Sequence, residues 1–102
     1  MILYNITVIV DKDIEIEFKE WAHRVFLPEL AKTDLFKSQA LLKIIDSPNE
    51  GETFCLQMHA SDEEKIGTFQ QNQLILLHNQ SAEVWANKIY TFESRMQYIA
   101  VY

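Results

Sequence analysis

The sequence has 102 residues, of which 48% are apolar and 24% charged, and its formal net charge is −6. A chain of this size buries about two-thirds of its unfolded surface, so we expect a single domain, residues 1–102, that needs no metal or disulfide to fold. The negative charge argues against a nucleic-acid backbone or an anionic membrane as partner, because both are bound through clustered Lys and Arg.

Cysteine usage and the start of the chain indicate the compartment. Cys55 is the only cysteine, which excludes an intrachain disulfide and a zinc site made of paired thiolates. The first residues carry no basic region followed by a small-residue cleavage site, and no apolar run approaches the roughly 20 residues of a membrane span. These features predict a protein of a reducing cytoplasm.

The first half of the chain reads as a strand followed by a helix. Residues 2–10 alternate with a period of two, which predicts a strand. Residues 13–31 predict a helix, because Ile14, Phe18 and Trp21 recur at helical spacing. Pro28 has no backbone N–H to donate, so we expect a kink or break just before it.

The second half predicts a hairpin, a helix and a final strand. Residues 38–46 and 53–60 form the hairpin, and the turn-forming residues 47–51 link its strands. Ser61 and Glu64 have the spacing of a capping box, which predicts that a helix begins there. This helix is expected to be interrupted near 79–81, and residues 88–101 predict the last strand.

The order strand, helix, strand, strand, helix, strand predicts an α+β fold of the ferredoxin-like type (βαββαβ). In this fold a four-stranded antiparallel sheet carries both main helices on one face. The first and third strands are expected at its centre, with the last strand beside the first.

One sheet face must meet the helices, and the more apolar set of alternating positions is the natural candidate. That set is Tyr4, Ile6, Val8, Phe54, Leu56, Met58, Tyr90 and Phe92. The other face should then be mixed in polarity and should pair with a second copy, closing a dimeric α/β barrel around a semi-polar cavity. The apolar residues that motivate this homodimer are Leu3, Ile9, Leu41, Ile45, Ile89 and Ile99.

Several motifs resemble one family. They are the opening residues 1–8, Glu20-Trp21, the segment Leu27-Pro28-Glu29-Leu30, and Leu35-Phe36. Together they resemble the DUF4286 family, small bacterial proteins of unknown function whose fold is similar to that of the dimeric α/β-barrel group. The resemblance implies this fold and a cytoplasmic setting, but no activity. Members of the family usually carry a His where this chain has Phe26.

If a ligand-binding pocket exists, we expect it on the open face of the sheet. Its predicted residues, which would share one face of three neighbouring strands, are Asn5, Thr7, Gln57, His59, Glu93 and Arg95. His59 would handle a proton, Arg95 would bind an anion, and Glu93 would orient one of them. The alternative is that Glu93 and Arg95 form an ion-pair network that only fixes the register of the dimer.

Three functions compete on this evidence. The first is a homodimer that binds a small molecule, the second a cofactor-independent monooxygenase-like enzyme, and the third a plain protein-interaction module. Asn5 resembles an Asn of the haem-degrading enzymes on dimeric α/β barrels, but their central-strand Trp is missing from residues 53–60. No histidine spacing supports a metal site, so neither a metal nor a cofactor is expected.

Overall fold

The computed structural model describes residues 1–48 and 50–102 and contains one antiparallel sheet with strand order β2-β3-β1-β4. The strands are β1 (Ile2–Val10), β2 (Ser38–Lys43), β3 (Glu52–Ala60) and β4 (Ile89–Gln97). The helices are α1 (Glu15–Trp21), α2 (Leu27–Lys32), α3 (Glu63–Gln71) and α4 (Gln73–Glu83). This order and topology confirm the ferredoxin-like prediction, with β1 and β3 at the centre.

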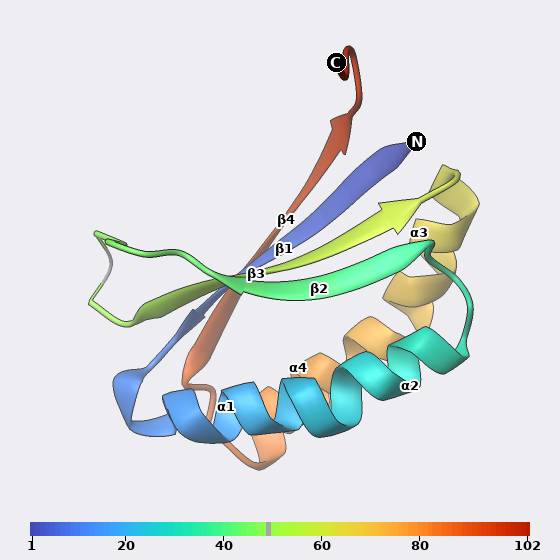
Figure 1. Ribbon diagram of the computed structural model, residues 1–102. Coiled ribbons are helices and arrows are strands. Elements are labelled where there is room, and N and C mark those ends of the chain that lie inside the picture. The colour runs from blue at the N-terminus through green and yellow to red at the C-terminus, as the bar shows by residue number, and fades with distance from the viewer. Residues whose placement is uncertain (49) are drawn as a thin grey trace.

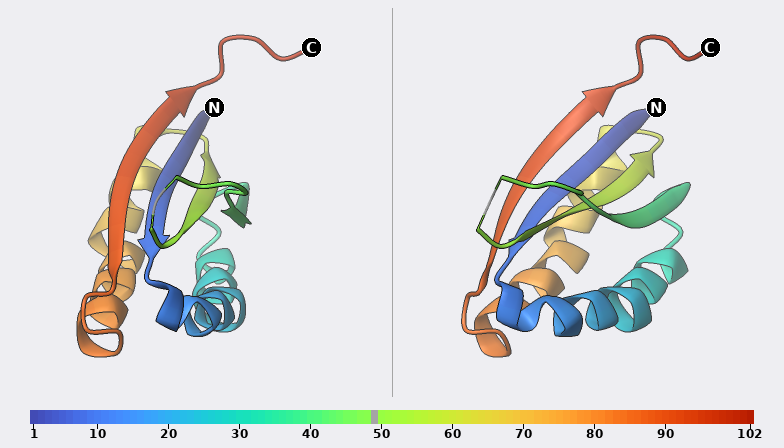
Figure 2. Two further views of the ribbon diagram at one scale, coloured as in Figure 1. Left: turned by 90° about the vertical axis from the view of Figure 1, so that its left-hand side faces the viewer. Right: turned by 60° about the vertical axis from the view of Figure 1, so that its left-hand side comes forward.

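All the helices lie on one face of the sheet and leave the other face uncovered (Figures 1 and 2). The core between the two layers combines the strand residues Tyr4, Ile6, Val8, Phe54, Leu56 and Met58 with helical side chains, among them Phe18, Leu30, Ile66 and Phe69. Trp21 and Trp85 meet edge to face, with ring centroids 5.5 Å apart. No helix among the described residues is long and apolar enough to cross a membrane.

The predicted break before Pro28 is a change of helical pitch instead. Residues Ala22–Phe26 form a π-helical turn after α1, and the chain then continues directly into α2 with Pro28 in its first turn. Because Pro28 cannot donate a hydrogen bond to the carbonyl of Arg24, the turn before it can widen without losing that bond. The helix therefore survives over the predicted range.

Two boundaries of the second helical region differ from the prediction. The side chain of Asp62, rather than Ser61, caps α3 by accepting a hydrogen bond from the backbone N–H of Lys65 at 3.0 Å. The interruption lies at Asn72, whose backbone is not helical, and α4 runs through the predicted interruption near residues 79–81.

The hairpin and the last strand also differ in extent. β2 ends at Lys43, and Asn49 of the predicted turn lies outside the described residues. β4 ends at Gln97, not at residue 101, because Gln97 is in register with Ile2 at the start of β1. Beyond Gln97 the neighbouring strand offers no backbone to pair with, and the chain runs past the sheet (Figure 1).

Candidate functional site

The open face of the sheet is defined by strand register. Residues directly opposite each other in antiparallel strands share a face, so the positions aligned with Leu3, Asn5, Thr7 and Ile9 of β1 define the uncovered side. We call the open face the set Leu3, Asn5, Thr7, Ile9, Ser38, Ala40, Leu42, Thr53, Cys55, Gln57, His59, Tyr90, Phe92, Ser94 and Met96.

The open face has exposed aromatic side chains, and none of its strand residues is charged. Phe92 is 60% exposed and Tyr90 is 68% exposed, although both are large apolar rings. Among the described residues of the four strands, no Asp, Glu, Lys or Arg lies on the open face. An uncharged face on a chain of net charge −6 is typical of a surface that is buried against a partner.

A polar row crosses the middle of the open face. In register across the four strands lie Ala40, Gln57, Asn5 and Ser94. Asn5 is only 6% exposed, and its Nδ2 donates to Thr7 Oγ1 at 3.0 Å. Its Oδ1 is buried and has no hydrogen-bond partner among the described residues. Buried side-chain oxygens are rarely left in this state, and Oδ1 is covered by the chain's own atoms.

His59 lies at the end of the open face and is engaged with the C-terminal segment. The rings of His59 and Tyr98 are stacked with centroids 5.9 Å apart, and the Tyr98 hydroxyl lies 3.3 Å from His59 Nδ1. Because β1 separates β3 from β4, Tyr98 crosses the end of β1 to reach His59. The register of β1 and β3 places Asn5, Thr7, Gln57 and His59 on one face, as predicted.

The prediction that Glu93 and Arg95 share this face is wrong. Both are in register with helix-facing residues of β1, Glu93 with Ile6 and Arg95 with Tyr4. Arg95 Nη1 pairs with Glu63 Oε2 of α3 at 3.0 Å. These two residues cannot group with His59, because alternate residues of β4 point to the sheet faces opposite to those predicted.

Glu93 instead joins a small polar cluster on the helix side of β4. Its Oε1 accepts hydrogen bonds from the hydroxyl of Tyr4 and, at 3.0 Å, from Nε2 of Gln70. The Tyr4 hydrogen bond holds the pKa of the Glu93 carboxyl below its usual range. Burial, together with the Glu93 carboxylate, raises the pKa of Tyr4 above its ordinary value. This cluster fastens the edge strand to α3.

Four apolar assignments are also reversed, three of them on β4 and one, Leu41, on β2. Tyr90 and Phe92, predicted to face the helices, lie on the open face, whereas Leu41 and Ile89 face the helices. Ile45 and Ile99 lie outside the strands. The missed signal was Tyr4, because a buried Tyr hydroxyl needs a polar partner and β4 offers one at Glu93.

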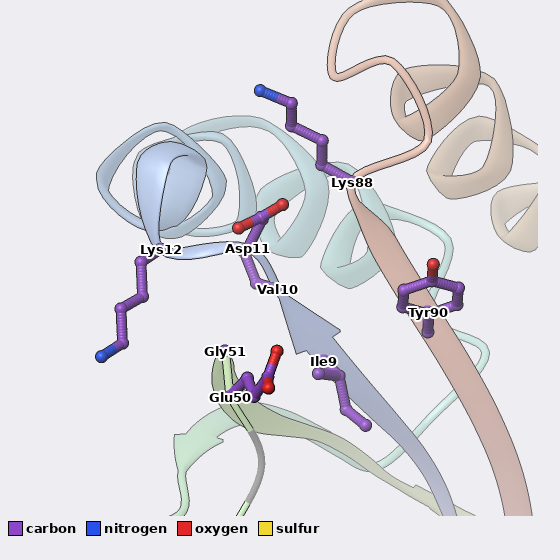
Figure 3. A pocket seen from close by; sticks show the side chains of 8 residues that line it. All are labelled: Ile9, Val10, Asp11, Lys12, Glu50, Gly51, Lys88 and Tyr90. Carbon is purple, nitrogen blue, oxygen red and sulfur yellow. The ribbon is translucent and has the colours of Figure 1, made fainter.

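A hollow of about 400 Å³ opens at the end of β1, beside the open face. Ile9 and Tyr90 line it, together with a rim of Asp11, Lys12, Glu50 and Lys88 (Figure 3). The two acidic and two basic groups balance, and Lys88 is already paired with Asp13 at 2.5 Å. In the part of the chain that the structure describes, no group of His, Cys, Asp or Glu is arranged to hold a metal.

Comparisons with known proteins agree on the fold. The family described as a domain of unknown function, DUF4286, matches residues 1–99. An ethyl tert-butyl ether D (EthD) family protein from Bacillus halodurans C-125 is similar with a TM-score of 0.68 at 12% identity, over 95% of this chain and 100% of the other.

Two dimeric ferredoxin-like proteins from an uncultured marine organism are also similar. Their TM-scores are 0.62 and 0.59, each at 9% identity, over 99% of this chain and 97% and 96% of theirs. At such low identity these likenesses establish the ferredoxin-like fold alone. A search of curated proteins finds no significant match.

Proposed function

We propose that this chain, which belongs to the DUF4286 family, forms a homodimer through the open face and binds a small molecule in a semi-polar cavity between the two sheets. The observation that carries the proposal is the open face itself, which combines the exposed rings of Tyr90 and Phe92 with a row of uncharged polar side chains that includes Asn5. Each subunit is a single domain of the bacterial cytoplasm, a setting that suits the free Cys55 thiol.

Pairing through the open face is supported by the unfavourable free energy of exposing its apolar side chains to water. Along β1 and β4, Tyr90 and Phe92 adjoin Ile9 at one end, the 43%-exposed Met96 adjoins Leu3 at the other, and the polar row between them leaves this strip uncharged. Water contact with this strip is unfavourable by roughly 25 cal/mol per Å² of apolar surface. A second copy presents the same uncharged strip and removes both from water. Two structures of similar fold are themselves described as dimeric.

A cavity is supported by the sizes of the residues in adjacent rows. The row of Leu42, Cys55, Thr7 and Phe92 has large side chains at its two ends, whereas the central row has the small Ala40 and Ser94 at its ends. Facing sheets pack about 10 Å apart, a separation set by their larger side chains. Small residues then leave space between the sheets, and Asn5, Thr7, Gln57 and His59 are the polar groups placed to contact a ligand there.

Light scattering on purified protein tests the dimer. At high micromolar concentration the wild type should give twice the 12.0 kDa chain mass, and Phe92→Asp should give the monomer because it places a charge in the interface. Ile16→Asp is the matched control, since Ile16 is 72% exposed on α1, away from the open face. A monomeric wild type contradicts the proposal.

A thermal-shift screen of small molecules tests the cavity. A ligand present at 100 times its dissociation constant stabilises the protein by about 2.7 kcal/mol, which is a clear rise in Tm. A plain interaction module would bind none of them, whereas a monooxygenase-like enzyme would consume its ligand together with oxygen. A dimer that no compound stabilises would contradict the binding function.

A further inference from the structure

We infer that a groove between the two rows of helices binds a small primary amine with an apolar body, and that the carboxylate of Glu83 holds its ammonium group. The residues that line this helix groove all come from the helical layer, among them Trp21, Val25, Phe26, Glu29, Leu76 and Glu83. The site is therefore separate from the open face and goes beyond the proposed function.

Two helical rows form the walls of the helix groove. One row is α1, the π-helical turn and α2, and the other is α3 and α4; they lie side by side on the same face of the sheet (Figure 2). Trp21, Val25 and Glu29 line the groove at intervals of four along the first row, and Leu76 and Glu83 line it from α4. The hollow between the walls measures about 310 Å³, the small end of the range for ligand pockets.

Aromatic rings of the core keep the two rows apart. Trp21 meets Trp85, which follows α4, with ring centroids 5.5 Å apart, and Phe26 meets Phe69 of α3 at 6.3 Å. The rows cannot approach further without displacing these packed rings. The π-helical turn also brings two successive residues, Val25 and Phe26, to the same hollow, and such turns are frequent at functional sites.

The walls of the helix groove leave apolar surface in contact with water. Val25 is 49% exposed and Leu76 is 51% exposed, and Trp21 is partly exposed between them and the core. An apolar group bound in the groove removes this surface from water, which is favourable. The indole ring of Trp21 is in addition the aromatic ring that attracts cations best.

The charges of the helix groove favour a cation. Its described lining residues include Glu29 and Glu83 but no Lys, Arg or His. Glu29 is paired with Lys32 at 3.3 Å, whereas Glu83 has no ion pair among the described residues. Glu83 is also the last residue of α4, whose last turn carries no basic side chain, so the negative end of the helix dipole adds to its carboxylate. An ammonium group is attracted by both.

Three probes of matched shape test the inference on the wild-type protein. Phenethylamine is a cation, phenethyl alcohol is uncharged, and hydrocinnamate is an anion. Binding is followed by the NMR shifts of ¹⁵N-labelled protein, including the indole N–H of Trp21. We expect phenethylamine to bind about fivefold more tightly than the alcohol and hydrocinnamate not to bind, and about 0.5 M NaCl should remove most of the preference.

Two variants assign the preference to Glu83. Glu83→Gln should make phenethylamine and phenethyl alcohol bind equally, and it should fold, because it removes a carboxylate from the negative end of α4. Glu64→Gln is the matched control, since it removes one charge from an exposed position in the first turn of α3, outside the groove. It should keep the preference for the amine.

Each other outcome overturns the inference in a recognisable way. Equal binding of amine and alcohol in the wild type, or a preference that survives Glu83→Gln, rejects the ligand class. A probe that leaves the Trp21 signal unmoved is bound elsewhere and rejects the site, as does a protein that binds none of the three. These outcomes leave the proposed dimer untouched, because light scattering tests it separately.

Discussion

β3 and β4 flank β1 on opposite sides and both alternate apolar with polar residues, yet they use the alternation in opposite ways. On β3 the large apolar side chains Phe54, Leu56 and Met58 face the helices and are buried. On β4 the large apolar side chains Tyr90 and Phe92 face away from the helices and are exposed. Apolar alternation therefore indicates a side that avoids water, without specifying which layer covers it.

The position of each strand in the sheet explains this difference. β3 has strands on both sides, so its helix-facing residues lie under the middle of the helical layer. β4 is an edge strand, and the polar side chains of α3 reach its helix side, where Gln70 meets Glu93 and Glu63 meets Arg95. Tyr90, Phe92 and Met96 of β4 lie on the open face, which no helix of the same chain covers (Figure 1).

Truncation of one phenylalanine on each strand gives the largest expected contrast. Phe54→Ala should lower the free energy of unfolding by about 3–5 kcal/mol, because it leaves a cavity in the core. Phe92→Ala should lower it by less than about 1 kcal/mol in dilute, monomeric protein, since the ring is exposed there. Urea unfolding at low protein concentration measures both. Equal losses would contradict the assignment of the two faces.

The Glu93 cluster gives a smaller, pH-dependent effect. Since the folded state holds the pKa of Glu93 below its usual range, the carboxylate stabilises the fold at neutral pH, and this contribution is lost as pH falls through the folded pKa. Glu93→Gln should cost about 1 kcal/mol or less at pH 7, because the site is partly solvated. The difference from wild type should vanish at acidic pH. A gap that persists at pH 3 would show that the carboxylate charge is not its cause.

The smallest expected effect is the change of the dimer Kd with salt concentration, which depends on the open face alone. Each chain carries a formal charge of −6, and the proposed interface contains no charged strand residue. Added salt then screens only the repulsion between subunits, so the dimer Kd should fall about two- to threefold from about 0.05 M to about 0.5 M NaCl. Sedimentation measures this change. A weaker dimer at high salt would indicate ion pairs across the interface.

The sequence predicted the parts of the fold that local patterns determine. Helical spacing, strand alternation and the order of elements were sufficient for the ferredoxin-like topology and for the faces of β1 and β3. The helix cap was misplaced by one residue because Ser61 and Asp62 are both good N-caps. The break at Asn72 was missed because no Gly or Pro marks it, and tertiary packing rather than local propensity decides such a position.

The candidate site was half predictable. Asn5, Thr7, Gln57 and His59 lie on strands whose alternation has one clear interpretation, and the structure places them together. Glu93 and Arg95 were misplaced because both sides of β4 reach solvent in one chain, so burial by the helices could not be separated from burial by a partner. The contact between Tyr98 and His59 depends on how the chain turns after β4, which no local pattern encodes.

Cys55 gives the open face a reporter of its own. It is the only cysteine in the sequence, it is partly exposed, and it lies between Leu42 and Thr7 on the open face. A thiol-specific reagent can therefore label a single atom on this surface without any engineered substitution. Dilution that separates two paired sheets would speed the labelling, and any occupant of the space between them would slow it. The labelling rate of Cys55 in the native protein thus reports whether the open face is covered.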